Sequence, residues 1–299
     1  MRVLVSGATG FLGRHALPAL RARGFEVHSI GRTPAPGATH HPADLLDAAA
    51  VGQAVRAARA THLLHLAWDV TPGYWHAPGN LDWVAASLHL ARCFAASGGQ
   101  RLVGAGTCAE YEWGAQRFDE ATTPCRPATL YGAGKDGVRR LLLAAAAPLG
   151  LSVAWGRLFY LYGPGEGPGR LVGGALAALS RGEGFDTSHG RQRRDFLHVA
   201  DAGHGFAALL AGAVTGVVNI GAGEAVPVRR VLDTLAAALG GSGHIRFGAR
   251  PLAAGEPLVI EAAITRLRDE VGFVPRFGLE AGLRDTVRCF RIAAATGAG

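Results

Sequence analysis

The strongest constraint on the fold is a set of three glycines that follows the first apolar run of the chain. Residues 2–6 have the pattern of a buried strand, and Gly7-Ala8-Thr9-Gly10-Phe11-Leu12-Gly13 comes directly after them. Glycines at this spacing allow a close approach of backbone to ligand, and the helix that follows offers free amides to an anion. Glycines also serve turns that bind nothing, so the strand–turn–helix context carries the inference. It predicts a dinucleotide-binding turn.

Strand-like and helix-like segments alternate through the first half of the chain. Short apolar runs predict strands at 2–6, 25–30, 62–66, 101–105 and 152–156, and a later run at 216–220 adds another. Segments rich in Ala, Leu and Arg predict helices at 11–23, 47–59, 80–97 and 131–148. Regular alternation of this kind implies a parallel sheet with helices on both faces. The fold class is therefore α/β, with a doubly wound parallel sheet of the Rossmann type.

The pattern changes after about residue 160. Residues 163–169 are rich in Gly and Pro, 188–195 are polar, and helical patterns occur at 170–181, 227–239 and 279–295. We expect a dinucleotide-binding domain from residues 1–160 plus about 195–222, and a smaller substrate-binding lobe from about 161–194 plus 223–299. Because ligands of open α/β sheets bind beyond the carboxyl ends of the strands, the lobe is expected to close over that edge.

Composition narrows the class of partner. The 299 residues are 49% hydrophobic and 18% charged, which describes a soluble globular chain with a large core, and the formal net charge is +7. The arginines are scattered, so nucleic acid is not expected; anionic small molecules are favoured, although an ordinary basic surface explains the charge equally well. No apolar stretch is long enough to span a bilayer, so no membrane is expected.

The four cysteines bear on compartment and metal binding. They show no metal-ligand spacing, and the chain opens on a strand pattern rather than a signal peptide. Free thiols in a reducing compartment are the default for such a chain. These observations predict a cytoplasmic protein without a metal site.

Lysine occurs only once, at Lys135, four residues after Tyr131, so the other 29 of the 30 basic residues are arginine. A GC-rich coding sequence explains the scarcity of lysine but not the position of the one that remains. Residues four apart share a helix face, so the ammonium of Lys135 can reach the neighbourhood of the Tyr131 phenol. A nearby cation lowers the pKa of a phenol from about 10. The spacing predicts an acid/base pair.

Two further positions suggest how such a pair would be used. The strand at 101–105 leads to Thr107, whose hydroxyl could hydrogen-bond a substrate oxygen, although a local cap at the strand end is the alternative. The second strand ends in Gly31-Arg32, where an Asp or Glu would bind the ribose of NAD. Arg32 and Arg14 instead favour the 2′-phosphate of NADP, unless Arg32 only points into solvent. Further on, Asp44-Leu45 could approach the adenine.

Together, the glycine loop, Thr107 and Tyr131-x-x-x-Lys135 resemble the extended short-chain dehydrogenases/reductases, and among them the nucleotide-sugar epimerase/dehydratase/reductase branch. The resemblance covers nearly the whole chain. The further matching segments, in order, are His65-Leu66-Ala67, Asn80, 157–164, 194–199, 219–221, Arg250-Pro251 and 267–275.

The resemblance implies roles for particular residues. Tyr131 would be the acid/base, Lys135 would hold the nicotinamide ribose and lower the tyrosine pKa, and Thr107 would orient the reacting oxygen. The residues implied to bind the dinucleotide are Gly7, Thr9, Gly10, Phe11, Leu12, Gly13, Arg14, Arg32, Asp44, Leu45, Leu66, Ala67, Tyr131, Lys135 and Tyr160. Thr107, Arg170, Arg194 and Arg250 would bind a nucleotide-diphosphate sugar. For Arg194 and Arg250, a surface or inter-lobe ion pair is the alternative. A homodimer through the helices at 80–97 and 131–148 is also implied.

Departures from the family pattern separate its branches. Sugar-nucleotide dehydratases carry an Asp-Glu pair after the threonine, whereas this chain has Cys108 and Ala109, so dehydration is not expected. Glu110 comes one position late and would face the other side of an extended segment. Cys108 is interpreted as a packing residue rather than a catalytic thiol. Tyr160 replaces the usual asparagine near the nicotinamide.

The function predicted from these residues is NADPH-dependent reduction of the 4-keto group of a nucleotide-linked 6-deoxy sugar. NADP(H) is the favoured cofactor, and NAD(H) remains an alternative. A nucleotide-sugar 4-epimerase that keeps NAD bound would use the same residues. A dinucleotide-binding regulatory protein without catalysis is the alternative of another class, and such proteins commonly lose the Tyr-Lys pair that this chain keeps.

Overall fold

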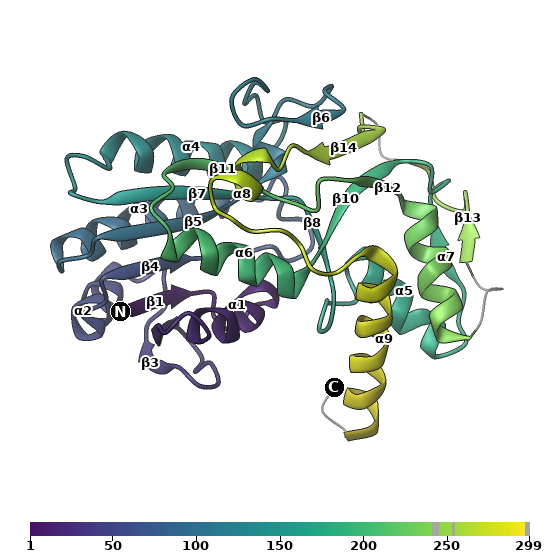
Figure 1. The fold of residues 1–299 in the computed structure, drawn as a ribbon, viewed down its shortest axis with the longest axis horizontal. Helices are drawn as coiled ribbons and strands as arrows, with labels where there is room; N and C mark the ends of the chain where they lie inside the picture. Colours follow the sequence, from purple (N-terminus) through teal and green to yellow (C-terminus); the bar gives the residue numbers. More distant parts are fainter. Residues whose placement is uncertain (241–244, 253–254, 297–299) are drawn as a thin grey trace.

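The computed structural model describes residues 1–240, 245–252 and 255–296. Its centre is a seven-stranded sheet with the strand order β11-β7-β5-β4-β1-β2-β3, in which every neighbouring pair is parallel (Figure 1). The strands are β1 (Arg2–Ser6), β2 (Glu26–Gly31), β3 (Thr39–Pro42), β4 (His62–His65), β5 (Arg101–Thr107), β7 (Ser152–Leu158) and β11 (Gly216–Ile220). The doubly wound parallel sheet predicted from the sequence is confirmed.

Burial explains why most of these strands, but not β3, were expected. All seven residues of β5 are buried, as befits a parallel strand covered on both faces, and its sequence is a continuous run without charged residues after Arg101. β3 has the sequence Thr-His-His-Pro and no fully buried residue. It lies at the sheet edge, where a short polar strand is tolerated. Apolar periodicity therefore carries no signal for it.

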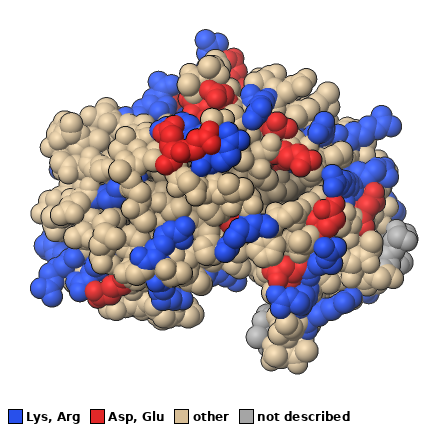
Figure 2. Space-filling view, in the orientation of Figure 1, with Lys and Arg blue, Asp and Glu red and all other residues tan. Residues whose placement is uncertain are grey.

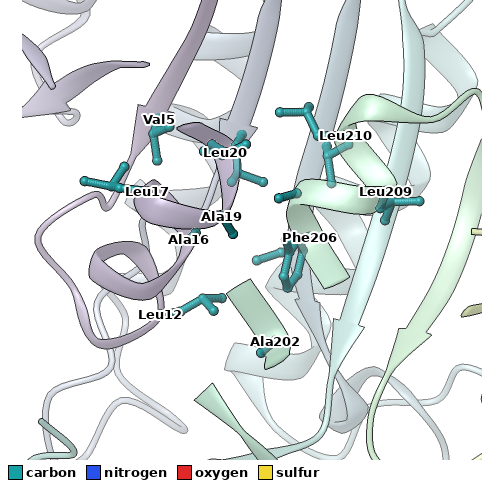
Figure 3. Packing of buried hydrophobic residues seen from close by; sticks show 14 of the residues in the cluster. Val5, Leu12, Ala16, Leu17, Ala19, Leu20, Ala202, Phe206, Leu209 and Leu210 are labelled. Atoms are coloured by element: carbon teal, nitrogen blue, oxygen red, sulfur yellow. The ribbon is translucent and has the colours of Figure 1, made fainter. Parts of the chain in front are cut away.

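Five helices cover the two faces of this sheet. On one face lie α2 (Ala48–Ala58), α3 (Asn80–Ala96) and α4 (Leu130–Ala145), and on the other lie α1 (Phe11–Arg21) and α6 (Val199–Ala211). Figure 3 shows Ala16 and Leu20 of α1 on the side of that helix toward Phe206 of α6. The sequence did not predict α6, because two glycines weaken its helical pattern. A Cβ at Gly203 would lie 2.6 Å from the carbonyl oxygen of His15, so this glycine lets the two helices meet closely.

A second group of elements lies beyond the carboxyl ends of the central strands (Figure 1). One mixed sheet contains β12 (Ala225–Pro227), β10 (Arg193–His198), β14 (Val259–Ala262), β6 (Arg117–Phe118) and β8 (Tyr160–Tyr162). A two-stranded sheet pairs β13 (Ile245–Phe247) with β9 (Phe185–Thr187). The helices here are α5 (Leu171–Ser180), α7 (Val228–Leu239) and α9 (Leu279–Thr296), and the short α8 (Thr265–Asp269) follows β14.

Strand β10 crosses the domain boundary expected near residue 195. Its Asp195 is fully buried, and its carboxylate accepts backbone hydrogen bonds from Ala222 at 2.6 Å, Gly223 at 2.8 Å and Ala262 at 3.1 Å. Burial raises the pKa of this carboxyl to about 6. The segment at 188–195 has a polar sequence, yet its last three residues belong to β10, and the acidic one has its hydrogen-bond partners inside the protein. The division into two domains stays a prediction.

Charged residues of both signs are interspersed on the face shown in Figure 2, in keeping with the scattered arginines of the sequence. Within the described ranges, no helix is both long and apolar enough to cross a membrane. All four cysteines are unpaired.

Candidate active site

The glycine loop forms a tight cradle between β1 and α1. Gly7 has a φ of +71°, and a Cβ there would lie 2.8 Å from the amide nitrogen of Ala67. A Cβ at Gly13 would lie 2.0 Å from the carbonyl oxygen of Gly7. Gly10 caps α1, and no described side chain caps the helix there, so its first-turn amides can bind an anion. This geometry fits the pyrophosphate of a dinucleotide.

A buried chain of hydrogen bonds fixes the neighbouring loop that carries Leu66 and Ala67. His65 Nδ1 lies 2.7 Å from the Ser6 hydroxyl, and its Nε2 lies 2.9 Å from the Ser87 hydroxyl. Ser87 donates to the carbonyl of Trp83 at 2.7 Å, so it accepts from Nε2 of a neutral histidine. Burial, helped by the charge of Lys135, lowers the pKa of His65 to about 3. This histidine therefore stays neutral beside the loop.

Thr107 ends β5 and is buried at 9% exposure. Its hydroxyl oxygen accepts a hydrogen bond of 3.2 Å from the amide of Ala109, so the local cap considered as its alternative role is present. Accepting this bond leaves the hydroxyl proton available to a substrate oxygen. Both roles expected of Thr107 are therefore compatible.

Tyr131 lies in the first turn of α4 and is enclosed by aromatic rings. The ring centres of Tyr74, Trp75 and Trp68 lie 4.9, 5.6 and 6.2 Å from that of Tyr131, each nearly perpendicular to it. The amide of Tyr131 donates to the carbonyl of Trp75 at 3.0 Å, which ties the loop after β4 to the helix. Burial raises the pKa of the Tyr131 phenol, while hydrogen bonding with Thr107 acts in the opposite direction.

The ammonium of Lys135 is directed from α4 at strand β5. It donates to the carbonyl of Ala105 at 2.8 Å and lies 4.2 Å from the centre of the Trp68 ring. Burial lowers the pKa of Lys135 to about 7. Burial dominates the pKa of Tyr131, and the effect of Lys135 on that pKa stays a prediction.

Glu110 also departs from expectation. Residues Cys108–Glu110 form a short 3-10 helix rather than an extended segment, and the side chain of Glu110 folds back to accept the amide proton of Thr107 at 2.9 Å. Sequence reasoning missed this role and the aromatic enclosure of Tyr131. The available signal was the pair of glycines, Gly104 and Gly106, that leaves the carboxyl half of one face of β5 without side chains.

Cys108 is 7% exposed, and burial raises the pKa of its thiol to about 12, as suits a packing residue. No group of three or more His, Cys, Asp or Glu side chains in the described part of the chain could hold a metal ion. Tyr160 lies in β8, and the guanidinium of Arg194 is 5.6 Å from its ring centre.

The three arginines expected to bind the substrate diphosphate differ in their burial and in their contacts. Arg194 is 2% exposed and pairs with Glu256 at 2.5 Å, so the ion pair given as its alternative role is present. Arg250 is exposed. Arg170 precedes α5, and its guanidinium lies 5.4 Å from the ring centre of Tyr74, which places it beside the aromatic enclosure.

Four residues are expected near the adenosine end of the cofactor: Arg14, Arg32, Asp44 and Leu45. Arg14 and Arg32 are exposed, and Arg14 donates a hydrogen bond of 3.4 Å to the carbonyl of Gly10. Asp44 accepts the amide proton of Leu46 at 3.0 Å in a local turn. Leu45 is buried in the core. The expected contacts of these four residues with a dinucleotide stay predictions.

The doubly wound sheet, the glycine cradle and the group of Thr107, Tyr131 and Lys135 together define a dinucleotide-dependent α/β enzyme. The model of the NAD-dependent epimerase/dehydratase family matches residues 3–221. The chain belongs to this family.

Individual relatives within the family differ in reaction. A 3-diazoavenalumate denitrifying reductase from a Streptomyces species is 33% identical over 265 residues, which cover 80% of this chain and 82% of the relative. A dTDP-4-dehydro-6-deoxy-D-allose reductase from Streptomyces bikiniensis is 27% identical and covers 97% and 96%. The crystal structure of Thermus thermophilus UDP-glucose 4-epimerase with NAD is 27% identical, covers 97% and 99%, and superposes with a TM-score of 0.88. All three are enzymes, which argues against the non-catalytic alternative.

Proposed function

We propose that the protein reduces the 4-keto group of a nucleotide-linked 6-deoxy sugar with NADPH. The observation that carries this proposal is the convergence of Thr107, Tyr131 and Lys135 at the carboxyl end of β5, next to the glycine cradle that fits a dinucleotide. The nicotinamide of the bound dinucleotide would supply the hydride. The relative that reduces a dTDP-4-dehydro-6-deoxy sugar covers nearly the same length of chain, which supports this substrate class.

The proton chemistry is proposed for the phenol of Tyr131. A phenol keeps its proton at neutral pH, and Tyr131 would donate that proton to the oxygen that forms when a carbonyl is reduced. Thr107 would donate a hydrogen bond from its hydroxyl to that oxygen. Lys135, held on Ala105, would orient the cofactor ribose beside them.

NADP(H) is the proposed cofactor because two exposed guanidiniums, Arg14 and Arg32, follow the first two strands where a ribose 2′-phosphate would lie. Arg170, Arg194 and Arg250 are proposed to bind the diphosphate of the substrate. For Arg194 this requires exchange of its partner Glu256 for phosphate. The contact of Tyr160 with the nicotinamide side of the site is also proposed.

A 4-epimerase remains the rival within the same substrate class. The Thermus thermophilus UDP-glucose 4-epimerase shares the fold over almost the whole chain and contains NAD. Such an enzyme would oxidise and re-reduce one sugar without net consumption of cofactor. The exposed arginines at the cofactor end favour the reductase.

A second candidate is reduction of an aromatic substrate that carries no nucleotide. The relative with 33% identity is named for 3-diazoavenalumate rather than for a nucleotide sugar. Two features of the site favour this candidate: three aromatic rings enclose Tyr131, and Arg194 already has a carboxylate partner. The aromatic rings could pack against an aromatic substrate. Because Arg194 is already paired, the site has less unpaired positive charge for a diphosphate.

A homodimer through α3 and α4 is proposed as well. Leu81 of α3 and Leu141 of α4 are 61% and 52% exposed, which is unusual for large apolar side chains. Sedimentation of the protein and of a Leu81→Asp/Leu141→Asp variant tests this: a dimer that dissociates in the variant supports it, and a monomeric protein contradicts it.

The reaction is tested by following NADPH oxidation against TDP-, GDP-, CDP- and UDP-linked 4-keto-6-deoxy sugars and against aromatic diazo acids. The proposal predicts one NADPH consumed per sugar reduced, with TDP-linked substrates among those accepted. Conversion of a nucleotide sugar without loss of NADPH would identify the epimerase. Turnover of the aromatic acids alone would identify the second candidate.

A further inference from the structure

Glu110 is a buried carboxylate at the end of the strand that carries Thr107. It is fully buried, and its Oε1 accepts hydrogen bonds from the amide of Thr107 and from Trp155 Nε1, both at 2.9 Å. Its Oε2 accepts from Arg157 Nε at 2.7 Å. Arg157 is itself 1% exposed, so the pair is held inside the protein. Removing two charges from water costs free energy that their attraction often only repays. A contribution to stability therefore does not by itself explain why this ion pair is buried.

The sequence of β5 makes room for this arrangement. A Cβ at Gly106 would lie 2.3 Å from Glu110 Oε1 and 2.1 Å from Trp155 Nε1. A Cβ at Gly104 would lie 2.3 Å from the ring of Trp155. Glycine inside a strand weakens it, so two glycines here indicate that another group must approach the backbone. That group is the side chain of Trp155 together with the carboxylate of Glu110.

The residues between and beyond these glycines hold the reactive groups. Ala105 accepts the hydrogen bond of the Lys135 ammonium, and Thr107 presents the hydroxyl. We propose that Glu110 is a positioning residue, whose carboxylate fixes residues 105–107 and through them the hydroxyl of Thr107 and the ammonium of Lys135. The assignment of the reaction to these two groups rests on the function proposed above.

The charges around Glu110 come from several elements. Arg157 of β7 bonds to it, Arg139 of α4 lies 3.8 Å away, and Asp136 of α4 lies 3.9 Å from Arg157. Its charge raises the pKa of its partner Arg157 and also acts on Lys135, Tyr131 and Cys108, each of which it shifts toward a higher pKa. Burial lowers the pKa of Lys135, and the charge of Glu110 opposes that effect. Lys135 in turn lowers the pKa of His65, which lies in β4.

The single lysine permits a direct test without substrate or cofactor. In protein labelled only at lysine, one side-chain NMR signal arises, and its titration gives the pKa of Lys135. Glu110→Gln keeps the size of the side chain but removes its charge, so the pKa of Lys135 is expected to fall by about one unit. Asp136→Asn is the matched control: it removes another buried carboxylate of the same network, from the residue next to Lys135, and is expected to leave that pKa unchanged.

A second variant, Glu110→Asp, separates the effect of the length of the Glu110 side chain from the effect of its charge. Glu110→Asp keeps the charge but is one methylene shorter, so it cannot hold both Arg157 and the amide of Thr107. Hydrogen exchange at the Thr107 amide is expected to be at least about 10-fold faster in this variant, which corresponds to the loss of one buried hydrogen bond. If Glu110→Gln alone does not fold, Glu110→Gln combined with Arg157→Met leaves no unpaired charge and should lower the pKa of Lys135 equally.

An unchanged Lys135 pKa in a folded Glu110→Gln protein would overturn the proposal, as would an equal fall in Asp136→Asn. Thr107 amide exchange at the wild-type rate in Glu110→Asp would also overturn it. Because none of these measurements uses a substrate, they are independent of whether the protein reduces a nucleotide sugar.

Discussion

Lys135 donates a hydrogen bond of 2.8 Å to the carbonyl of Ala105, two residues before Thr107 on the same strand. The lysine is 3% exposed, and the Trp68 ring lies over its ammonium. The site is therefore built for a compact cation on a flexible stem, which arginine cannot reproduce.

Lys135→Arg should lower kcat by about 100-fold, because a guanidinium displaces the neighbouring groups by the order of an ångström. Overpacking of the buried site should also reduce the free energy of unfolding by about 1–3 kcal/mol. Steady-state kinetics and urea unfolding measure the two effects. Arg140→Lys, an exposed change on the same helix, should leave both quantities nearly unaltered. Full activity of Lys135→Arg would refute the special role of the lysine.

The local parts of this site could be predicted from the sequence. The glycine turn and the Tyr131–Lys135 spacing depend on neighbouring residues and on helix geometry, and the structure has the expected strand, turn and helix at each. The direction of the Lys135 side chain could not be predicted, because it depends on a carbonyl 30 residues earlier in the chain.

Elements that depend on distant contacts were missed for the same reason. The pattern of α6 is weakened by Gly203, whose purpose is visible only where α1 packs against it. Asp195 obscures the strand pattern of β10 because an aspartate is unusual in a buried strand. Its carboxylate accepts hydrogen bonds from three backbone amides of other segments. Glu110 would face the other side only in an extended segment, and the chain instead forms a 3-10 helix after Thr107. In each case a polar or small residue had a buried partner that sequence order does not reveal.

His65 should make the fold sensitive to acid. Its pKa is about 3 in the folded protein and about 6.5 when unfolded, so the unfolded state binds the extra proton between these values. Stability contributed by the neutral ring is fully present above pH 6.5 and is lost as the pH falls toward 3, by roughly 2–3 kcal/mol between pH 7 and pH 4.5. Urea unfolding at these two pH values measures the loss. His65→Gln should reduce the difference, and an equal difference in the variant would show that His65 is not its source.

Arg32→Ala should change cofactor preference. If Arg32 binds the 2′-phosphate, its loss should weaken NADPH binding by roughly 10- to 100-fold, as for a charge-assisted hydrogen bond, and leave NADH binding nearly unchanged. Fluorescence titration with each cofactor measures the two Kd values. Arg92→Ala, an exposed change on α3, serves as the control. Equal weakening of both cofactors by Arg32→Ala would contradict a contact with the phosphate.

Glu256→Gln should expose the charge of Arg194 to a substrate diphosphate. In the wild-type protein the carboxylate must leave this arginine before phosphate can bind, so UDP or TDP should bind about 10-fold more tightly to the variant. The variant without ligand should be less stable, because a buried guanidinium loses its partner. Thermal shifts with and without the nucleotide measure both effects. Nucleotide affinity that is the same in Glu256→Gln and in Arg194→Leu would exclude Arg194 from the diphosphate site.

The central claim is that Tyr131 completes a hydride transfer from NADPH to a sugar carbonyl by donating a proton. Its most direct test uses NADPH carrying deuterium at the transferable position of the nicotinamide, with the nucleotide-linked 4-keto-6-deoxy sugar as acceptor. The wild-type protein should place one deuterium on C4 of the product, and Tyr131→Phe should still bind NADPH but react about 100- to 10,000-fold more slowly. Product that forms without deuterium at C4, or an undiminished rate in Tyr131→Phe, would contradict the claim.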